Sequence, residues 1–572
     1  MNKMERRQKI EVMKTAVRSQ LLQRRRKDGM WSGFLSDSAV STSVSLFALN
    51  MVDASQYAVQ IMHSRRWLCE NMKPDGSWGD SEESPSNRTA TLLAYASLTG
   101  TGGVPDAAVR YIHEVLGWDN EQKMIQGILD YYGKDLTFSV PILMMCALCG
   151  VIRDWSRIPL LPFELAVLPQ RFFRFLNLPV VSYAIPALIA VGVLQNHMRP
   201  GLMARLRRPF VEPALRVLAR LQPEDGGFLE AAPLTAFVAM CLTGAGLREH
   251  PVTQACIRFL VGTVRDNGAW PIDTDLSGWV TSLSARALSA GLSDAERQAL
   301  SDVIRRNATR SRHPFTGAPA GGWGWSDRTG SVPDGDDTSG ALVALYHLLG
   351  GRYVPEVGAG INWLMQLQNR DGGMPTFCKG WGKLPFDRST PDITAHAILA
   401  MALWLPSLSG SLKQNCEKSL SRLFDWLEKE QEKQGSWNPL WFGDQDSPDG
   451  SNRVYGVATL IDYLCSSGHP RADRLAERSV GFLLAAQNED GGWGGERNVP
   501  SKVTLSAKAL SALSFYPSAS EKHIARGIDY LYRHYEAGTL CRREPVGLYF
   551  SKLWYSEDLY NLTFILTALE RL

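Results

Sequence analysis

The sequence predicts an all-α protein built from helical repeats, and three observations support that fold class. One pattern recurs along the 572 residues: an aromatic–aliphatic pair, often a glutamine, and then a glycine turn that ends in an aromatic residue. After each copy, a Ser/Thr-rich segment opens another apolar helical run, as at residues 89–97 and 504–513. Runs with the two-residue alternation of β-strands are few.

Each copy of the repeat has the features of a helix that ends and lets the chain turn back. In the last copy, Phe482 and Leu483 lie on the helix, Gln487 follows, and residues 490–493 read Asp-Gly-Gly-Trp. The glycine suits the left-handed position after a helix, and the tryptophan can fold back over the turn. We therefore interpret the Trp and Gln side chains as staples of the fold. The other turns lie at 28–31, 75–78, 225–228, 267–270, 371–374 and 435–437.

Helix pairs that each bury one face against the next either stack into a solenoid or close into an α/α barrel, and the repeats leave both open. The length allows two or more domains. The net charge of +3 gives no support to nucleic-acid binding. The nine cysteines are scattered, as expected of reduced thiols in the cytoplasm. Cys146 and Cys149 form a single CxxC without a second pair, so we predict no metal site there.

The sequence predicts no membrane-spanning helix and no secretory signal. Residues 1–27 are polar and basic, without the apolar core of a signal peptide. Val180–Leu194 is the most apolar stretch, but it contains a proline and is shorter than the roughly 20 residues that span a bilayer. Met198–Leu221 mixes arginine with large apolar residues. It could lie on an anionic membrane surface or form an ordinary surface helix with buried arginine stems, and both interpretations stay open.

Residues 333–339 read Pro-Asp-Gly-Asp-Asp-Thr-Ser and contain three carboxylates within four positions. Asp334, Asp336 and Asp337 repel one another, which favours a retained proton on at least one of them. Proline and aspartate also suit the first turn of a helix, so a simple Asp-rich cap is an alternative. A calcium loop is less suitable, because its twelfth position needs glutamate and holds Leu345.

A second helix start, at residues 390–396, places Asp392 and His396 four residues apart and so on one helix face. A histidine oriented by a carboxylate could hydrogen-bond and tune an acid, although a lone histidine is more often a core residue. The chain also has 17 Trp, 17 Tyr and 20 Phe. A cavity lined by such rings stabilises a carbocation by its π faces and offers no nucleophile. Protonation of an alkene requires a strong acid in such a dry cavity.

With these motifs, nearly the whole chain resembles the squalene–hopene cyclases and the wider class II terpene cyclases. The resemblance rests on the DxDD motif at 334–337, on the repeats (QW motifs in that family) and on the Asp-x-Thr-Ala-His at 392–396. It implies that Asp336 is the general acid that protonates a terminal double bond, flanked by Asp334 and Asp337. It also implies that His396 hydrogen-bonds that acid, that Tyr455 lies behind it, and that no metal or other cofactor takes part.

The same resemblance implies a fold of two α/α-barrel domains. Residues 1–20 with 258–572 would form the catalytic domain, and 21–257 the second domain, with a membrane-binding segment at 198–221. The expected partners are a linear isoprenoid, one leaflet of a membrane at its cytoplasmic face, and a second copy of the chain in a homodimer. The family's cavity aromatics match Trp155, Trp279, Trp325, Phe377, Trp441 and Tyr555.

The chain departs from the family pattern near its C-terminus. Pro545 and Leu548 stand where phenylalanines are expected, and Lys552 stands where another aromatic is expected. Residues 445–450 are an insertion, and the chain is short for a triterpene cyclase. These departures put full pentacyclic ring formation in doubt and leave room for a shorter or polar-headed substrate, which Lys552 or Arg453 could contact.

Squalene is the first substrate to test, and a farnesyl or geranylgeranyl diphosphate or a prenylated aromatic is the alternative. The sequence has no DDxxD motif, so magnesium-assisted ionisation of a diphosphate is not expected. Two other classes stay open. A protein prenyltransferase β-subunit needs a zinc site of Asp, Cys and His, and no matching Asp-x-Cys is present. A non-catalytic repeat scaffold gives no reason for three aspartates beside an aromatic cavity.

Overall fold

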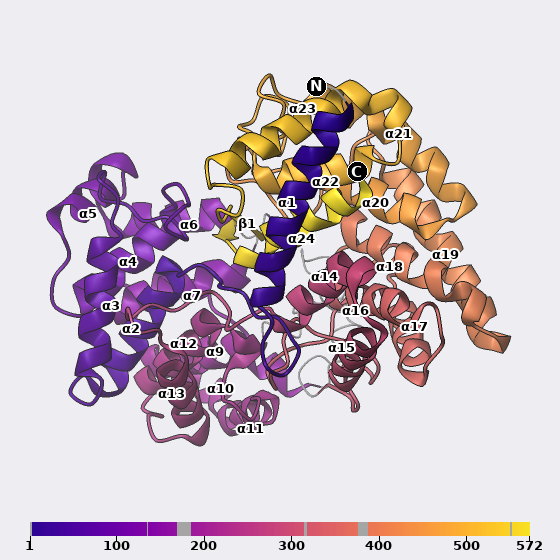
Figure 1. The fold of residues 1–572 in the computed structure, drawn as a ribbon. Coiled ribbons are helices and arrows are strands. Elements are labelled where there is room, and N and C mark those ends of the chain that lie inside the picture. The colour runs from indigo at the N-terminus through magenta and orange to yellow at the C-terminus, as the bar shows by residue number, and fades with distance from the viewer. Residues whose placement is uncertain (1–2, 134, 169–184, 314–316, 376–386, 549–551) are drawn as a thin grey trace. The chain divides into compact units, whose positions relative to one another are not determined.

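Nearly all of the regular secondary structure in the described residues is helical. The computed structural model describes residues 3–133, 135–168, 185–313, 317–375, 387–548 and 552–572 (Figure 1). Within these ranges the sole sheet is one antiparallel pair, β1 (Val546–Leu548) and β2 (Leu553–Tyr555), in which Val546 pairs with Tyr555. The all-α prediction is confirmed. The chain forms two compact units: unit 1 comprises 1–34, 275–327 and 332–572, and unit 2 comprises 35–274 and 328–331.

Unit 1 is an α/α barrel with an inner and an outer ring of helices. Each inner helix packs on the next, and the last packs back on the first, so the inner ring closes. The inner helices are α14 (Ser277–Leu288), α16 (Gly335–Leu349), α18 (Pro391–Trp404), α20 (Arg453–Ser467), α22 (Val503–Leu513) and α24 (Asp558–Arg571).

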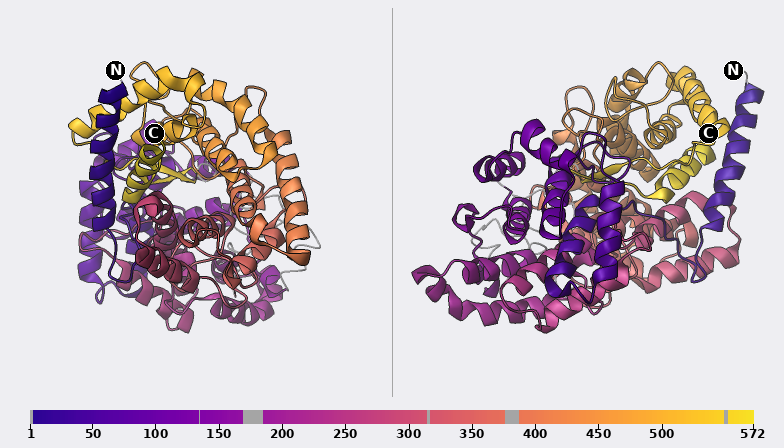
Figure 2. Two further views of the ribbon diagram at one scale, coloured as in Figure 1. Left: turned by 45° about the vertical axis from the view of Figure 1, so that its right-hand side comes forward. Right: turned by 90° about the vertical axis from the view of Figure 1, so that its left-hand side faces the viewer.

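The N-terminal helix belongs to the outer ring of unit 1, where it packs on α24 and α23 (Figure 2). The unit boundaries at 34/35 and 274/275 lie further along the chain than the expected 20/21 and 257/258. The reason is local: the Trp31 indole donates to Leu21 O at 2.7 Å, and the Trp31 backbone N–H donates to Thr281 Oγ1 at 2.9 Å. The first glycine turn therefore stays with unit 1. The outer helices are α1 (Lys3–Gln23), α15 (Asp294–Arg306), α17 (Pro355–Leu367), α19 (Gly410–Glu430), α21 (Pro470–Ala486) and α23 (Pro517–Glu536).

Unit 2 repeats the architecture with shorter outer helices. Its inner helices pack in sequence order, and α12 returns to α2. They are α2 (Ala39–Asp53), α4 (Arg88–Gly100), α7 (Leu136–Leu148), α9 (Ile185–Met198) and α12 (Ala232–Gly244). Around them lie α3 (Ala58–Glu70), α5 (Asp106–Arg110), α6 (Glu121–Tyr132), α10 (Leu202–Arg207), α11 (Val211–Leu221) and α13 (Pro251–Thr263).

The apolar stretch that ends at Leu194 forms the buried helix α9 where the structure describes it, from residue 185 onward. Among the described residues no helix is both long and apolar enough to span a bilayer.

The repeated tryptophans and glutamines are staples, as the sequence predicts. In five copies the indole N–H donates to the carbonyl of the leucine ten residues earlier, closing the turn over the end of its own helix: Trp31, Trp78, Trp270, Trp437 and Trp493. The glutamine holds two segments at once: Gln487 Nε2 donates to Gly491 O at 2.8 Å and to His523 O, on the next outer helix, at 2.9 Å. The turn needs glycine, since Gly491 has φ +90°.

A hydroxyl group from an inner helix completes the turns. The backbone N–H of the turn's last residue donates to a Ser or Thr side chain, as Trp493 N does to Ser506 Oγ at 2.9 Å. This bond explains the Ser/Thr-rich segments that follow the repeats. The equivalent acceptors for Trp31, Trp78, Phe228, Trp270, Trp323 and Met374 are Thr281, Thr91, Thr235, Thr42, Thr338 and Thr394.

Replacement of a staple glutamine should lower stability without touching the candidate site. Gln368 Nε2 donates to Gly372 O and Ser419 O, and its Oε1 accepts from Ser419 Oγ, all within the interior. Gln368→Leu leaves these groups buried without partners, so we expect a loss of about 2 kcal/mol in the free energy of unfolding. Urea unfolding checks this value. Gln20→Leu, at an exposed position of α1, is the matched control and should change stability by less than about 0.5 kcal/mol.

Candidate active site

The DxDD motif forms the first turn of α16, so the helix-cap interpretation and the acid interpretation are compatible. Asp334 is the cap: its Oδ1 accepts from the backbone N–H groups of Asp336 and Asp337, both at 2.8 Å. Thr338 ties this turn to the preceding glycine turn, because its hydroxyl accepts from Trp323 N at 3.0 Å. The cap therefore leaves the Asp336 side chain free to point elsewhere.

Burial favours a retained proton on the two outer aspartates of the motif. Burial raises the pKa of Asp334 to about 7, and burial together with the charge of Asp334 raises the pKa of Asp337 well above its usual range. Protonation within this pair would relieve the repulsion between the carboxyl groups, and Asp336 is the remaining carboxyl group of the motif.

Asp336 is hydrogen-bonded to His396, with 2.6 Å between Asp336 Oδ1 and His396 Nδ1. The histidine side chain is 2% exposed and the Asp336 side chain 22%, so Asp336 is the more accessible member of this pair. The imidazole lies face to face with Tyr463, with ring centroids 4.3 Å apart, and edge-on to Trp279 at 6.1 Å. His396 is therefore held by two rings in one orientation toward the carboxyl group.

The Asp392 carboxylate does not orient His396, contrary to what their four-residue spacing suggests. Asp392 accepts a hydrogen bond from the Thr390 hydroxyl at the start of α18, and burial raises its pKa to about 6. The ring nitrogen of His396 bonds Asp336 instead. Residues one turn apart share a helix face but not necessarily a partner, because each side chain also meets the neighbouring helices.

Tyr455 lies on α20, buried beside the same barrel interior. Its ring stacks on Phe442 with centroids 4.7 Å apart. Burial raises the pKa of Tyr455 well above its usual range, so the phenol stays neutral.

The predicted cavity aromatics are divided between the units. Trp279 and Trp325 are buried in unit 1, where the Trp279 backbone N–H donates to Trp325 O at 3.1 Å. Trp441 is half-buried, and Tyr555 is buried on β2 with its hydroxyl 3.3 Å from that of Tyr560. Trp155 belongs to unit 2, in a short 3-10 helix. Phe377 lies outside the described residues.

Several residues that the sequence reasoning missed complete the surroundings of the acid. Tyr463 stacks on His396, Phe442 stacks on Tyr455, and Tyr560 stacks on Phe564 at 5.7 Å. Two sequence signals could have pointed to residues of this interior. Tyr463 follows Tyr455 by two helical turns. Lys508 is the one charged residue of α22, which reads VTLSAKALSAL. The stacked pairs themselves join separate helices and have no signature in the sequence.

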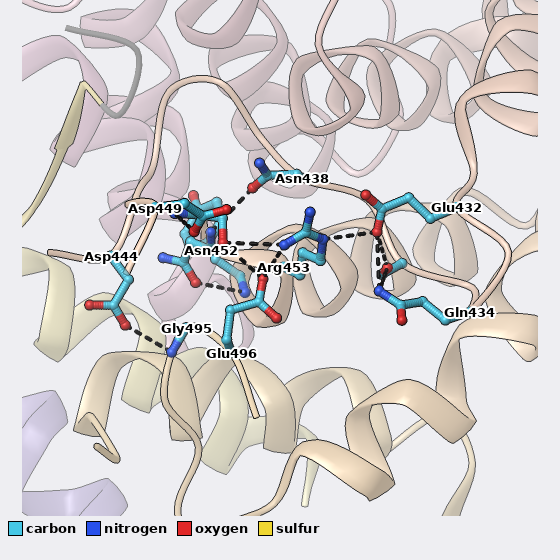
Figure 3. A network of polar contacts seen from close by, with 12 residues as sticks. Glu432, Gln434, Asn438, Asp444, Asp449, Asn452, Arg453, Gly495 and Glu496 are labelled. Atoms are coloured by element: carbon cyan, nitrogen blue, oxygen red, sulfur yellow. Dashed lines mark hydrogen bonds and ion pairs between the residues drawn. The ribbon is translucent and has the colours of Figure 1, made fainter. Parts of the chain in front are cut away.

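The inserted segment 445–450 is anchored by a polar network around it (Figure 3). Asp444 accepts from Gly495 N at 2.8 Å and forms an ion pair with Lys502, which also pairs with Asp446. These bonds hold the insertion against the start of α22.

The neighbouring Arg453 is paired with two carboxylates, Glu432 at 2.9 Å and Glu496 at 2.7 Å (Figure 3). Its cation serves the fold, so it is not a free contact for a polar substrate. Lys552 is exposed beside β2, at φ +52°. Among the residues that are described, no cluster of His, Cys, Asp or Glu has the arrangement of a metal site.

A closed α/α barrel with a DxDD turn at an inner helix, a histidine on the middle aspartate and buried tryptophans beside it defines a class II terpene cyclase. Comparison with known families agrees. The N-terminal domain of squalene–hopene cyclase matches residues 15–110, and its C-terminal domain matches residues 277–572. The chain belongs to the squalene–hopene cyclase family, whose members are cyclases of the intramolecular transferase type.

The chain is similar at low identity to several relatives. It is 24% identical over 88% of its length to the enfumafungin synthase of Hormonema carpetanum, of which it spans only 44%. It is 23% identical over 91% of its length to a probable squalene–hopene cyclase of Sinorhizobium fredii and spans 90% of that protein. The solved ent-copalyl diphosphate synthase of Streptomyces platensis shares the fold, with a TM-score of 0.55 and 18% identity over 98% of this chain and 99% of that one.

Proposed function

We propose that this protein cyclises a linear polyprenoid by protonating a terminal double bond, with Asp336 as the proton donor. The observation that carries the proposal is the bond between Asp336 and His396 in a setting of buried rings. Asp334 and Asp337 are both buried, and neither is as accessible as Asp336.

The chemistry follows from these positions. The π electrons of the alkene form a C–H bond with the proton of Asp336, and the O–H electrons stay on the carboxylate. The new tertiary cation is then attacked by the next double bond of the same chain, which closes a ring. The faces of Trp279 and the neighbouring rings stabilise the positive charge and contain no nucleophile that would trap it. His396 donates to the carboxylate that is left, which favours proton transfer.

Squalene is the proposed first substrate, since the relative from Sinorhizobium fredii is named for it. A shorter isoprenoid with a polar head group is the second candidate. It is favoured by Pro545 and Lys552 at positions where the family has aromatic residues. Incubation of the purified protein with squalene, geranylgeranyl diphosphate and a prenylated aromatic, followed by mass spectrometry of the products, distinguishes the candidates.

We further propose that unit 2 docks on one leaflet of a membrane, at the cytoplasmic face, through an apolar patch. The patch consists of exposed large side chains on and beside α10: Leu160, Met198, Leu202, Met203, Leu206 and Phe210. Leu202 is 76% exposed. Exposed apolar side chains gathered in this way favour a lipid or protein partner.

The arginines in this segment divide into two groups. Two of them bond inward. Arg199 donates to Ile158 O, and Arg207 donates to the Glu164 carboxylate and to Leu161 O. Arg205 and Arg208 are exposed beside the patch and would meet anionic head groups. The apolar face of α11 is buried, so the proposed contact is narrower than the predicted 198–221 and ends near Phe210.

Leu202→Glu with Met203→Glu should weaken membrane association at least tenfold, because two carboxylates would have to enter the interface. Flotation with liposomes of phosphatidylcholine and phosphatidylglycerol measures this. Arg216→Gln with Arg220→Gln, on the adjacent helix, is the control and should float almost as the unchanged protein does. Equal flotation of the glutamate variant would contradict the docking surface. A homodimer stays a prediction, which light scattering of the detergent-solubilised protein checks.

A further inference from the structure

The interior of unit 1 holds a second group of charges, which we call the cationic core: Arg286, Asp462, Lys508 and Arg571. They come from four inner helices. Arg286 Nη2 donates to Asp462 Oδ1 at 2.7 Å, and Arg571 Nη2 lies 2.8 Å from the same oxygen. Three basic side chains thus surround one carboxylate, and the charges do not cancel.

The cationic core is in contact with the candidate acid through aromatic rings. The Arg286 guanidinium lies 5.3 Å from the ring centroid of Tyr463, and Tyr463 stacks on His396, the partner of Asp336. The charged and titratable groups of this interior come from every inner helix: Arg286 on α14; Asp336, Asp337 and His347 on α16; Asp392 and His396 on α18; Tyr455, Asp462 and Tyr463 on α20; Lys508 on α22; and Tyr560 and Arg571 on α24.

Lys508 is the member of the core without an ion pair. Its Nζ lies 4.3 Å from the ring centroids of both Tyr455 and Phe564 and donates to Thr459 Oγ1 at 3.0 Å. No carboxylate of the described residues pairs with it. Burial lowers the pKa of Lys508 to about 8, with the charge of Arg286 acting in the same direction and those of Asp462 and Asp336 against it.

A buried lysine without an ion pair lowers the stability of the fold, and a second lysine, at the start of α22, provides a comparison. Lys502, six residues earlier, is also buried but is paired with Asp444 and Asp446, which raise its pKa. An apolar side chain at 508 would avoid the cost of burying a cation beside other cations. The cation therefore points to a function other than packing. Lys508 lies over the ring of Tyr455, and Arg286 lies over Tyr463, the ring that stacks on the partner of Asp336.

We propose that Lys508 is a positioning residue for proton transfer: with Arg286, its ammonium stabilises the Asp336 carboxylate that remains when the proton has left. The same positive charge repels the carbocation and keeps it on the substrate side of His396 and Tyr463. No covalent step at Lys508 is involved. This inference rests on the proposed function, in which Asp336 is the donor.

The test compares Lys508→Met and Lys508→Arg with the unchanged protein, using squalene in detergent as the probe. Geranylgeranyl diphosphate is the second probe if squalene is left unchanged. We expect Lys508→Met to lower kcat about tenfold or more, and Lys508→Arg to stay within a few-fold of the unchanged protein. Retained turnover in Lys508→Arg beside a loss in Lys508→Met would assign the effect to the positive charge. Lys502→Met is the matched control and should leave kcat unchanged.

Urea unfolding supplies a readout that needs no substrate. The pKa of Lys508 in the folded protein, about 8, is below the ordinary lysine pKa of 10.5, so its protonated form costs stability below pH 8. That cost decreases as pH rises toward 10.5. Lys508→Met should therefore unfold at a higher urea concentration than the unchanged protein at pH 7, and the difference should narrow at pH 10.

An unchanged kcat in Lys508→Met would overturn the inference, and so would an equal loss of kcat in Lys508→Met and Lys508→Arg, or a stability difference that is the same at both pH values. The variant Asp336→Asn separates this inference from the proposed function. If Asp336→Asn is fully active, or if neither probe is turned over by the unchanged protein, the proposed function fails. If Asp336→Asn is inactive while Lys508→Met behaves as the unchanged protein, only the role of Lys508 fails.

Discussion

Asp336→Asn should lower turnover by more than about 10³-fold and leave the fold intact. The amide has the shape of the carboxyl group but no proton to give to an alkene. Asp334 caps the helix, and both Asp334 and Asp337 are more deeply buried than Asp336, so neither can take over without breaking the first turn of α16. Product formation from squalene, measured by gas chromatography and mass spectrometry under single-turnover conditions, gives the rate.

The fold should tolerate this change because the amide that replaces the Asp336 carboxyl group can still bond His396. We expect the free energy of unfolding to stay within about 1 kcal/mol of the original. Asp425→Asn is the control, since Asp425 is exposed on α19 and makes only a surface ion pair with Arg471. It should keep full activity. Undiminished turnover by Asp336→Asn would contradict Asp336 as the proton source.

His396→Phe should lower turnover by about 10²-fold, the second largest effect that we expect. Phenylalanine fills the space between Tyr463 and Trp279 but removes the nitrogen that lies 2.6 Å from Asp336 Oδ1. The carboxylate that forms in the reaction then has no hydrogen-bond donor at this position. Because ring packing is retained, the loss should fall on kcat more than on KM.

The matched control is His523→Phe, on the outer helix α23, which should not change kcat. His396→Phe should also keep the circular dichroism spectrum of the original, so that a lost rate is not a lost fold. A variant with the original kcat would show that Asp336 acts without the histidine, and the role assigned to His396 would be wrong.

The repeat was predictable because its bonds are local. A glycine turn, an indole bonded ten residues back and a glutamine four residues before its own acceptor all lie within one short segment, such as 483–493. The cap of α16 is local as well: Asp334 accepts from residues two and three positions later. Sequence patterns report such contacts directly, because the partners have a constant spacing along the chain.

The partners of the acid were less predictable, because they come from helices that are far apart in the sequence. His396 meets Asp336 across 60 residues, and Lys508 reaches Thr459 across 49. The bond of His396 to Asp336 could be expected from the family resemblance alone, and spacing within α18 pointed to Asp392 instead. The ring that stacks on His396 and the cationic core had no pattern to predict them.

The amino-acid sequence alone determined the all-α fold, the staples of each turn, the position of the DxDD cap and the family. Only the tertiary structure decided which side chains meet inside the barrel: that His396 bonds Asp336 rather than Asp392, that Arg453 is paired within the fold, and that Lys508 is buried with no paired carboxylate among the described residues. The physical reason is the closure of the inner ring of helices, which sets the neighbours of each inward side chain by packing between helices, whereas turns and caps depend on a few adjacent residues.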